Sequence, residues 1–126
     1  VQGSTSRFQV SLEQILTWDP EYIVISTDYD PNSEVFNTIL NDEKWRGITA
    51  VSNQAVYEIP AVPFDWINRP PSINRLIGVQ WLANLLYPDL YPVDLDAEIT
   101  NYFMMIYGYE PTEQEISEML RNSNIN

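Results

Sequence analysis

Hydrophobic residues recur along the chain in short groups, and the spacing within the groups alternates between helical and extended patterns. The first group follows Ser11–Gln14, a segment of the capping-box type, which predicts a helix that ends at Asp19-Pro20. The next group, residues 22–25, is a β-branched run that is apolar on both faces. Such a run is typical of a strand covered on both sides of its sheet.

The middle of the chain continues this alternation. Asp30 and Pro31 are the residue types of a helix cap and a first helical position, so we expect a second helix to start there. Its apolar stripe ends near residues 41–42. Two apolar stretches then follow, residues 48–51 and 55–59, and the turn residues between them predict two further strands.

The last third of the chain is helical in pattern. Residues 72–87 form the longest apolar segment, and because its polar stripe is narrow we expect this helix to be largely buried. A second helix is expected from Asp94 to Gly108, and a third after the capping box at residues 112–115. Residues 122–126 are expected to be a frayed tail. Helices that alternate with buried strands indicate an α/β layered domain with a small sheet of three or four strands.

Composition narrows the functional classes. The chain has 126 residues, which fits one domain, and it carries a net charge of −12 with neither histidine nor cysteine. Such a charge disfavours binding to nucleic acids or anionic lipid. The missing residue types exclude Cys/His zinc sites, disulfides and Ser-His-Asp triads. We predict no cofactor and no metal, since the four glycines are not clustered into a phosphate-binding pattern.

The acidic residues offer weak candidates for chemistry. Residues 27–30 and 94–96 fall short of a calcium-binding loop and are better explained as helix caps and solvated loops. Lys44 lies among acids and is expected at the surface. No apolar stretch approaches the roughly 20 residues of a membrane-spanning helix.

The most unusual segment is a proline-rich loop, residues 63–72, between the last predicted strand and the long helix. It contains Phe64, Asp65, Trp66 and Arg69. Ligands of α/β sheets sit beyond the carboxyl ends of strands, where a tryptophan face and an arginine fork are suitable contacts. Alternatively, the two aromatic rings cap the core and the arginine pairs with a nearby acid.

Four segments in this order resemble one protein family, the periplasmic binding proteins that take up iron-siderophore, haem and vitamin B12. The segments are residues 10–25, 48–60, 72–88 and 103–112. In that family two α/β lobes hold the ligand between them. The resemblance implies a three-layer Rossmann-like lobe with a short, mostly parallel sheet flanked by helices. Residues 8–121 would be the C-terminal lobe alone, after a disordered or cloning-derived start at residues 1–7.

The resemblance also implies a function. The chain would be a non-enzymatic, extracytoplasmic lobe of an ABC importer receptor for iron complexes or cobamide-type metal chelates. Its partners would be the missing N-terminal lobe and the membrane permease.

The vitamin B12-binding members have an Asp-Trp-x-x-Arg arrangement that matches Asp65 to Arg69. Trp66 would pack on the ligand, Arg69 would meet its anionic edge, and Phe64 and Asp65 would line the mouth. Asn68 stands where those members have an acid, a candidate for permease docking.

Thr27 and Asp28, at the end of the first strand, are further candidate contacts. Two other functions remain open: a carboxylate-dependent glycoside hydrolase or carbohydrate-binding domain in which Trp66 stacks on sugar, and a protein-interaction module.

Overall fold

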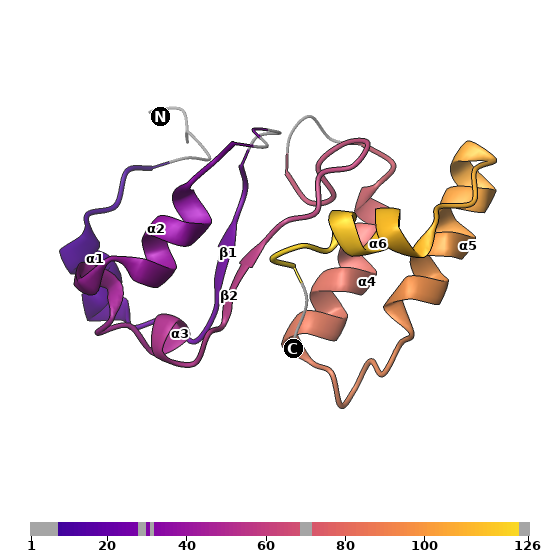
Figure 1. The fold of residues 1–126 in the computed structure, drawn as a ribbon. Helices are drawn as coiled ribbons and strands as arrows, with labels where there is room; N and C mark the ends of the chain where they lie inside the picture. The colour runs from indigo at the N-terminus through magenta and orange to yellow at the C-terminus, as the bar shows by residue number, and fades with distance from the viewer. Residues whose placement is uncertain (1–7, 28–29, 31, 69–71, 124–126) are drawn as a thin grey trace, which may run out of the picture.

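The computed structural model describes residues 8–27, 30, 32–68 and 72–123 (Figure 1). Two short strands lie at its centre, and helices precede and follow them. In chain order the elements are α1 (Leu12–Trp18), β1 (Ile23–Ile25), α2 (Val35–Asn41), the 3₁₀ turn η1 (Glu43–Trp45), α3 (Thr49–Ser52), β2 (Val56–Glu58), α4 (Arg75–Leu86), α5 (Leu95–Tyr107) and α6 (Glu113–Met119).

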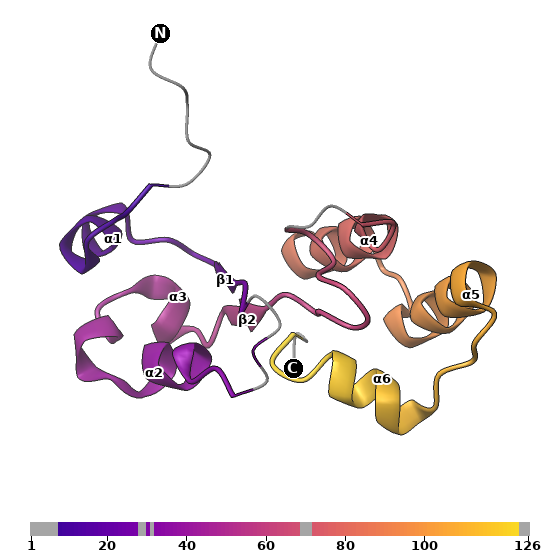
Figure 2. The ribbon, with the colours of Figure 1, turned by 90° about the horizontal axis from the view of Figure 1, so that it is seen from above.

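The strands β1 and β2 run parallel, with Ile23 opposite Val56 and Ile25 opposite Glu58. Seen from above, α1 and α4 lie on one side of the strands, and α2 and α6 lie on the other (Figure 2). The predicted α/β class with a short parallel sheet is therefore confirmed. Within the described residues the sheet has two strands, fewer than the three or four expected.

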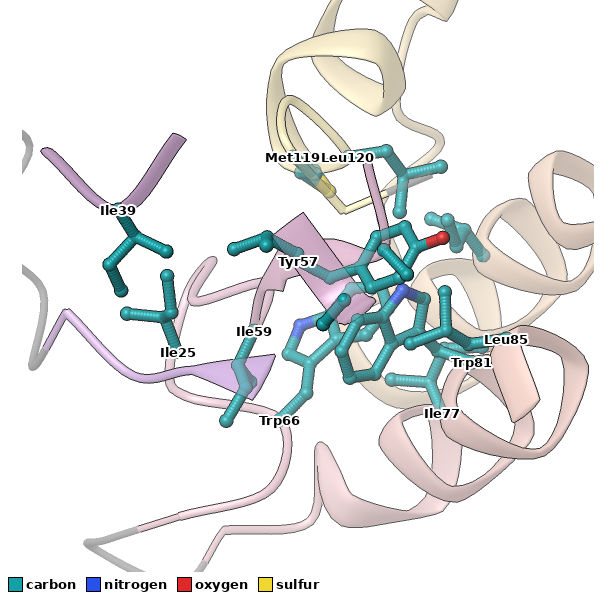
Figure 3. Close-up of a cluster of buried hydrophobic side chains, with 14 of the residues drawn as sticks. Ile25, Ile39, Tyr57, Ile59, Trp66, Ile77, Trp81, Leu85, Met119 and Leu120 are labelled. Atoms are coloured by element: carbon teal, nitrogen blue, oxygen red, sulfur yellow. The ribbon is translucent and has the colours of Figure 1, made fainter. Parts of the chain in front are cut away.

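The core joins β2 to the C-terminal helices. Figure 3 shows Trp66 within a cluster of buried side chains that includes Tyr57, Ile77 and Trp81. Trp81 is 1 % exposed, and its indole N–H donates to the carbonyl of Ser123 over 2.8 Å. The fold therefore buries Trp66 and Trp81, and it bonds the Trp81 indole to the C-terminal segment at Ser123.

Residues 48–51 do not form the predicted strand. They start α3, because residues far away in the sequence satisfy the first helical donors. The Asp19 carboxylate accepts hydrogen bonds from the Thr49 backbone N–H (2.7 Å) and hydroxyl (2.9 Å), and the Pro20 carbonyl accepts from the Ala50 N–H. The prediction of a strand at residues 48–51 was wrong.

The second helix starts later than predicted. The Asp30 carboxylate accepts from the Asn32 N–H over 2.9 Å, and its carbonyl accepts from the Ser33 N–H. These bonds close a local turn, so α2 begins only at Val35. Pro31 lies outside the described residues.

Helix α4 was wrongly expected to be largely buried. One side of it, including Ile77 and Trp81, faces the core, whereas Leu76 and Val79 are 60 % and 63 % exposed. It begins at Arg75, after Asn74 at the N-cap, and the Ser72 hydroxyl accepts the Asn74 N–H ahead of the helix.

The C-terminal segment is partly built into the sheet. The Glu58 N–H donates to the Asn122 carbonyl over 2.7 Å, and the Ser123 hydroxyl donates to the Glu58 carbonyl over 2.6 Å. Residues 122–123 therefore cover the outer edge of β2, and the prediction that they fray was wrong. Residues 1–7 and 124–126, also expected to be disordered or frayed, lie outside the described residues. The caps at Asp94, Gly108 and Thr112 are confirmed.

Candidate functional site

A concave pocket of about 540 Å³ lies at the carboxyl ends of both strands. Its walls come from Thr27 after β1, residues 32–37 at the start of α2, residues 58–62 at the end of β2, and residues 118–123, which comprise the end of α6 and the segment after it. Open α/β sheets bind ligands at this end of their strands. The pocket is therefore our candidate functional site.

The lining that the structure describes is acidic. It carries the four carboxylates of Asp30, Glu34, Glu58 and Glu118, against the guanidinium of Arg121. Two of the acids are tied to neighbouring amides: Asn122 donates to Glu58 over 2.9 Å, and Asn37 donates to Glu34 over 3.1 Å. Since like charges repel, this surface by itself suits neutral or cationic groups better than a dianion.

Beside the pocket lies the segment that we call the site loop, residues 60–68. The loop folds around its own tryptophan: the Trp66 backbone N–H donates to the Pro60 carbonyl, and the indole N–H donates to the Val62 carbonyl, each over 3.0 Å. Trp66 has no exposed surface. The loop is therefore a closed, internally bonded unit.

Asp65 ties the site loop to β1. The residue is 2 % exposed, and its carboxylate accepts hydrogen bonds from the Ser26 hydroxyl over 3.0 Å and from the Ile67 N–H over 2.7 Å. It also accepts from the Asn68 N–H. A carboxylate that accepts backbone donors fixes the turn that contains them. Asp65 thus shapes the loop from inside. The sequence had instead suggested that it lines the mouth of the ligand site.

Helix α4 supports the site loop from below. The Arg75 guanidinium donates to the carbonyls of Ile67 and Asn68, each over 3.0 Å. At Gly78, an added Cβ would lie only 2.1 Å from the Trp66 carbonyl oxygen, so the loop backbone rests directly on the helix. Sequence reasoning missed both residues. A glycine within a helical pattern was the available signal for such close packing.

A buried amide completes this support. Asn74, 0 % exposed, donates from Nδ2 to the Phe64 carbonyl, and its Oδ1 accepts from the hydroxyls of Tyr102 and Tyr107. Burial, reinforced by the neighbouring Tyr107, raises the pKa of Tyr102 to about 12. Tyr102 therefore stays protonated and able to donate at physiological pH.

Of the remaining predicted contact residues, three lie within the described part of the chain and two lie outside it. Thr27 is half-buried in the pocket wall, and the Phe64 ring is 48 % exposed. Asn68 is half-buried at the end of the site loop. Asp28 and Arg69 lie outside the described residues.

The burial of Trp66 does not fit the expectation that its ring packs against a ligand. In this structure the ring packs within the chain's own core, so it offers no stacking face to a sugar either. Phe64 remains exposed, so the site loop buries one of its two aromatic side chains and leaves the other at the surface. Among the described residues, no cluster of three or more acids could hold a metal, and no helix is long and apolar enough to cross a membrane.

Comparison with known proteins identifies relatives of one kind. Residues 2–63 match the sequence profile of a family described as periplasmic binding protein. The chain is 36 % identical over 106 residues to the molybdate-binding protein MolA of Haemophilus influenzae, covering 82 % of this chain and 29 % of MolA.

Solved structures agree. An ABC transporter solute-binding protein of Sulfurospirillum deleyianum superposes with a TM-score of 0.80 at 33 % identity, covering 90 % of this chain and 33 % of that chain. A periplasmic solute-binding protein of Veillonella parvula gives a TM-score of 0.75 at 27 % identity, covering 92 % of this chain and 36 % of that one. The structure of MolA bound to molybdate gives a TM-score of 0.65 at 34 % identity, covering 83 % of this chain and 31 % of that one.

This chain thus spans about a third of the length of its relatives. All of them are described as periplasmic, molybdate-binding or solute-binding proteins, so the resemblance to periplasmic binding proteins that was drawn from the sequence is confirmed. The name of MolA refers to molybdate, and none of these relatives is described as binding an iron complex.

Proposed function

Because this chain is related to the periplasmic binding proteins of ABC transporters, we propose that it forms one ligand-binding lobe of such a receptor. Residues 8–121 act as the C-terminal lobe. A second lobe of the same protein closes over the ligand outside the cytoplasm and presents it to the permease. The lobe captures solute reversibly and makes or breaks no covalent bond.

One observation carries this proposal: the concave pocket at the carboxyl ends of β1 and β2 lies beside a loop that is fixed from several sides. A receptor that binds without chemistry gains affinity when its contacts are ordered before the ligand arrives, because less entropy is lost on binding. The bonds of Trp66, Asp65 and Arg75 supply that order.

The ligand we favour is an oxyanion of the molybdate type. Support comes from MolA, which is 36 % identical over most of this chain. The described pocket lining sets four carboxylates against the single guanidinium of Arg121, so binding a dianion calls for a further cation. Arg69, which follows the site loop directly in the sequence, is our proposed anion contact, with Thr27 and Asp28 as flanking polar contacts.

A metal chelate is the second candidate. The Asp-Trp-x-x-Arg pattern of residues 65–69 favours it, as does the exposed Phe64 ring, which could cover the apolar part of a chelate. Asn68 occupies the position of an acid in the family's pattern, so we propose that a different acidic residue docks this lobe on the permease.

Calorimetric titration of the complete receptor with sodium molybdate tests the proposal, with sulfate and cobalamin as competing probes. Losing one charge-assisted contact weakens binding by about ten-fold or more, so Arg69→Ala should raise the Kd for molybdate by that factor. Arg46→Ala, which removes an exposed arginine that pairs with Glu43, should leave the Kd unchanged and serves as the control. Saturable binding of cobalamin in place of molybdate would select the chelate, and binding of neither probe would refute the receptor function for these ligands.

A further inference from the structure

Asn74 joins three parts of the molecule through a single side chain. It lies just before α4 with no exposed surface, and its amide reaches both the site loop and α5. Nδ2 donates to the Phe64 carbonyl over 2.9 Å, and Oδ1 accepts from the Tyr102 hydroxyl over 3.0 Å and from the Tyr107 hydroxyl. The nitrogen of the amide thus bonds to the site loop, and its oxygen bonds to α5.

Ring contacts hold the tyrosine end of this network together. The rings of Tyr102 and Tyr107 meet edge to face with centroids 6.2 Å apart, and Phe103, which is 4 % exposed, lies against Tyr107 at 5.3 Å. Tyr102 is half-buried and Tyr107 is 37 % exposed, and both hydroxyls point to the buried Asn74 amide. The position of the Asn74 amide is therefore set by α5 and not only by its own helix.

The other end acts on the backbone of the site loop at Phe64. This residue presents an exposed ring, while the next two, Asp65 and Trp66, are buried. The chain therefore turns from surface to core at the peptide whose carbonyl Asn74 holds. The hydrogen bond that Asn74 donates to the Phe64 carbonyl therefore lies at the boundary between the exposed and the buried part of the site loop.

We propose that Asn74 is a positioning residue that fixes the site loop relative to α5. It touches no ligand and acts through the Phe64 carbonyl. This inference deepens the proposed function and rests on it in one respect, namely that the site loop faces the solute. Its structural part, the dependence of loop order on the Asn74 amide donor, can be measured without any ligand.

Asn74→Asp isolates this donor. The introduced carboxylate has the same shape and still accepts from both tyrosines, but it places an oxygen opposite the Phe64 carbonyl and repels it. Protonation at low pH gives the carboxyl an O–H that can donate to the same carbonyl, so acid should restore the link. Asn84→Asp is the matched control, because Asn84 lies on α4 and donates to the Tyr91 carbonyl, away from the site loop.

Hydrogen exchange of the indole N–H groups, followed by NMR, reports the result. The Trp66 indole donates within the site loop, and the Trp81 indole donates to Ser123, which lies outside it. At neutral pH, Asn74→Asp should speed Trp66 exchange by about ten-fold, the effect of losing one buried hydrogen bond, and leave Trp81 within about two-fold of wild type. Relative to wild type at the same pH, the Trp66 difference should shrink as the solution is acidified.

Equal acceleration at both indoles would overturn the proposal, because Asn74 would then support the whole fold and not the loop. Unchanged exchange at Trp66 would overturn it as well. In the complete receptor, Asn74→Asp should also raise the Kd for sodium molybdate several-fold, while Asn84→Asp should not. If the wild-type receptor does not bind molybdate, the proposed ligand fails, and the exchange experiment still decides the role of Asn74.

Discussion

Replacing Gly78 by alanine would place a methyl group where α4 supports the backbone of the site loop. The added Cβ would lie 2.1 Å from the Trp66 carbonyl oxygen, 2.8 Å from its carbonyl carbon and 3.0 Å from the Ile67 side chain. The first two atoms belong to the backbone, so no rotamer change relieves the contact. Either α4 or the peptide after Trp66 must move by roughly 1 Å to reach an ordinary van der Waals separation.

The magnitude follows from what that movement breaks. Displacing Trp66 disrupts its two hydrogen bonds, to Pro60 and Val62, which contribute about 1 kcal/mol each. Overpacking strain adds about 1–3 kcal/mol. Alanine is a better helix former than glycine, which offsets about 1 kcal/mol of this loss in stability. The net expectation is a loss of about 2–4 kcal/mol in the free energy of unfolding.

Urea unfolding monitored by circular dichroism would measure this loss as a lower transition midpoint at an unchanged slope. Gly47→Ala is the matched control, since its Cβ would meet Leu16 at an ordinary 3.4 Å and should change stability by less than about 0.5 kcal/mol. If Gly78→Ala were as stable as the wild type, the close approach of loop and helix would not be a real constraint, and the reasoning would be refuted.

Two further predictions concern the C-terminal helices. Gly108 ends α5 at φ +62° with open space around it, so Gly108→Ala should cost about 1 kcal/mol in urea unfolding through backbone strain alone, and an unchanged midpoint would contradict this. The hydrogen bond from Tyr109, with those from Thr112, lowers the pKa of Glu115 below its ordinary value of 4.5, so this carboxylate stabilises the fold above that pH, and the contribution disappears as pH falls through the lowered pKa. Glu115→Gln should therefore lower the midpoint of thermal unfolding at pH 7, and its difference from wild type should shrink as the pH falls below 4.5; an equal loss at every pH would contradict the linkage.

Local chemistry in the sequence determined where many elements begin and end. The run at residues 23–25 consists of β-branched side chains, which favour extended backbone, and it forms β1 in the structure. The starts of α5 and α6 follow from Asp94 and Thr112, whose side chains accept the first backbone donors of their own helices. These signals act within four residues, so no knowledge of the tertiary structure is needed to interpret them.

The candidate site was only partly predictable. The sequence located the loop after β2 and the exposed Phe64, because prolines and aromatic residues stand out in composition. It assigned Trp66 and Asp65 to the ligand-facing side, whereas the structure buries both. The local sequence does not determine whether a tryptophan between prolines packs outward or inward. In the structure α4 approaches the Trp66 backbone at Gly78, where an added Cβ would lie 2.1 Å from the Trp66 carbonyl oxygen.

Tertiary contacts decided the rest. Residues 48–51 became helical because Asp19, thirty positions earlier, accepts the donors of Thr49. Asn74 acquired its role from two tyrosines 28 and 33 positions later. Such partners are invisible in a local pattern, since the energy that selects each conformation comes from groups that the chain brings together only when it folds.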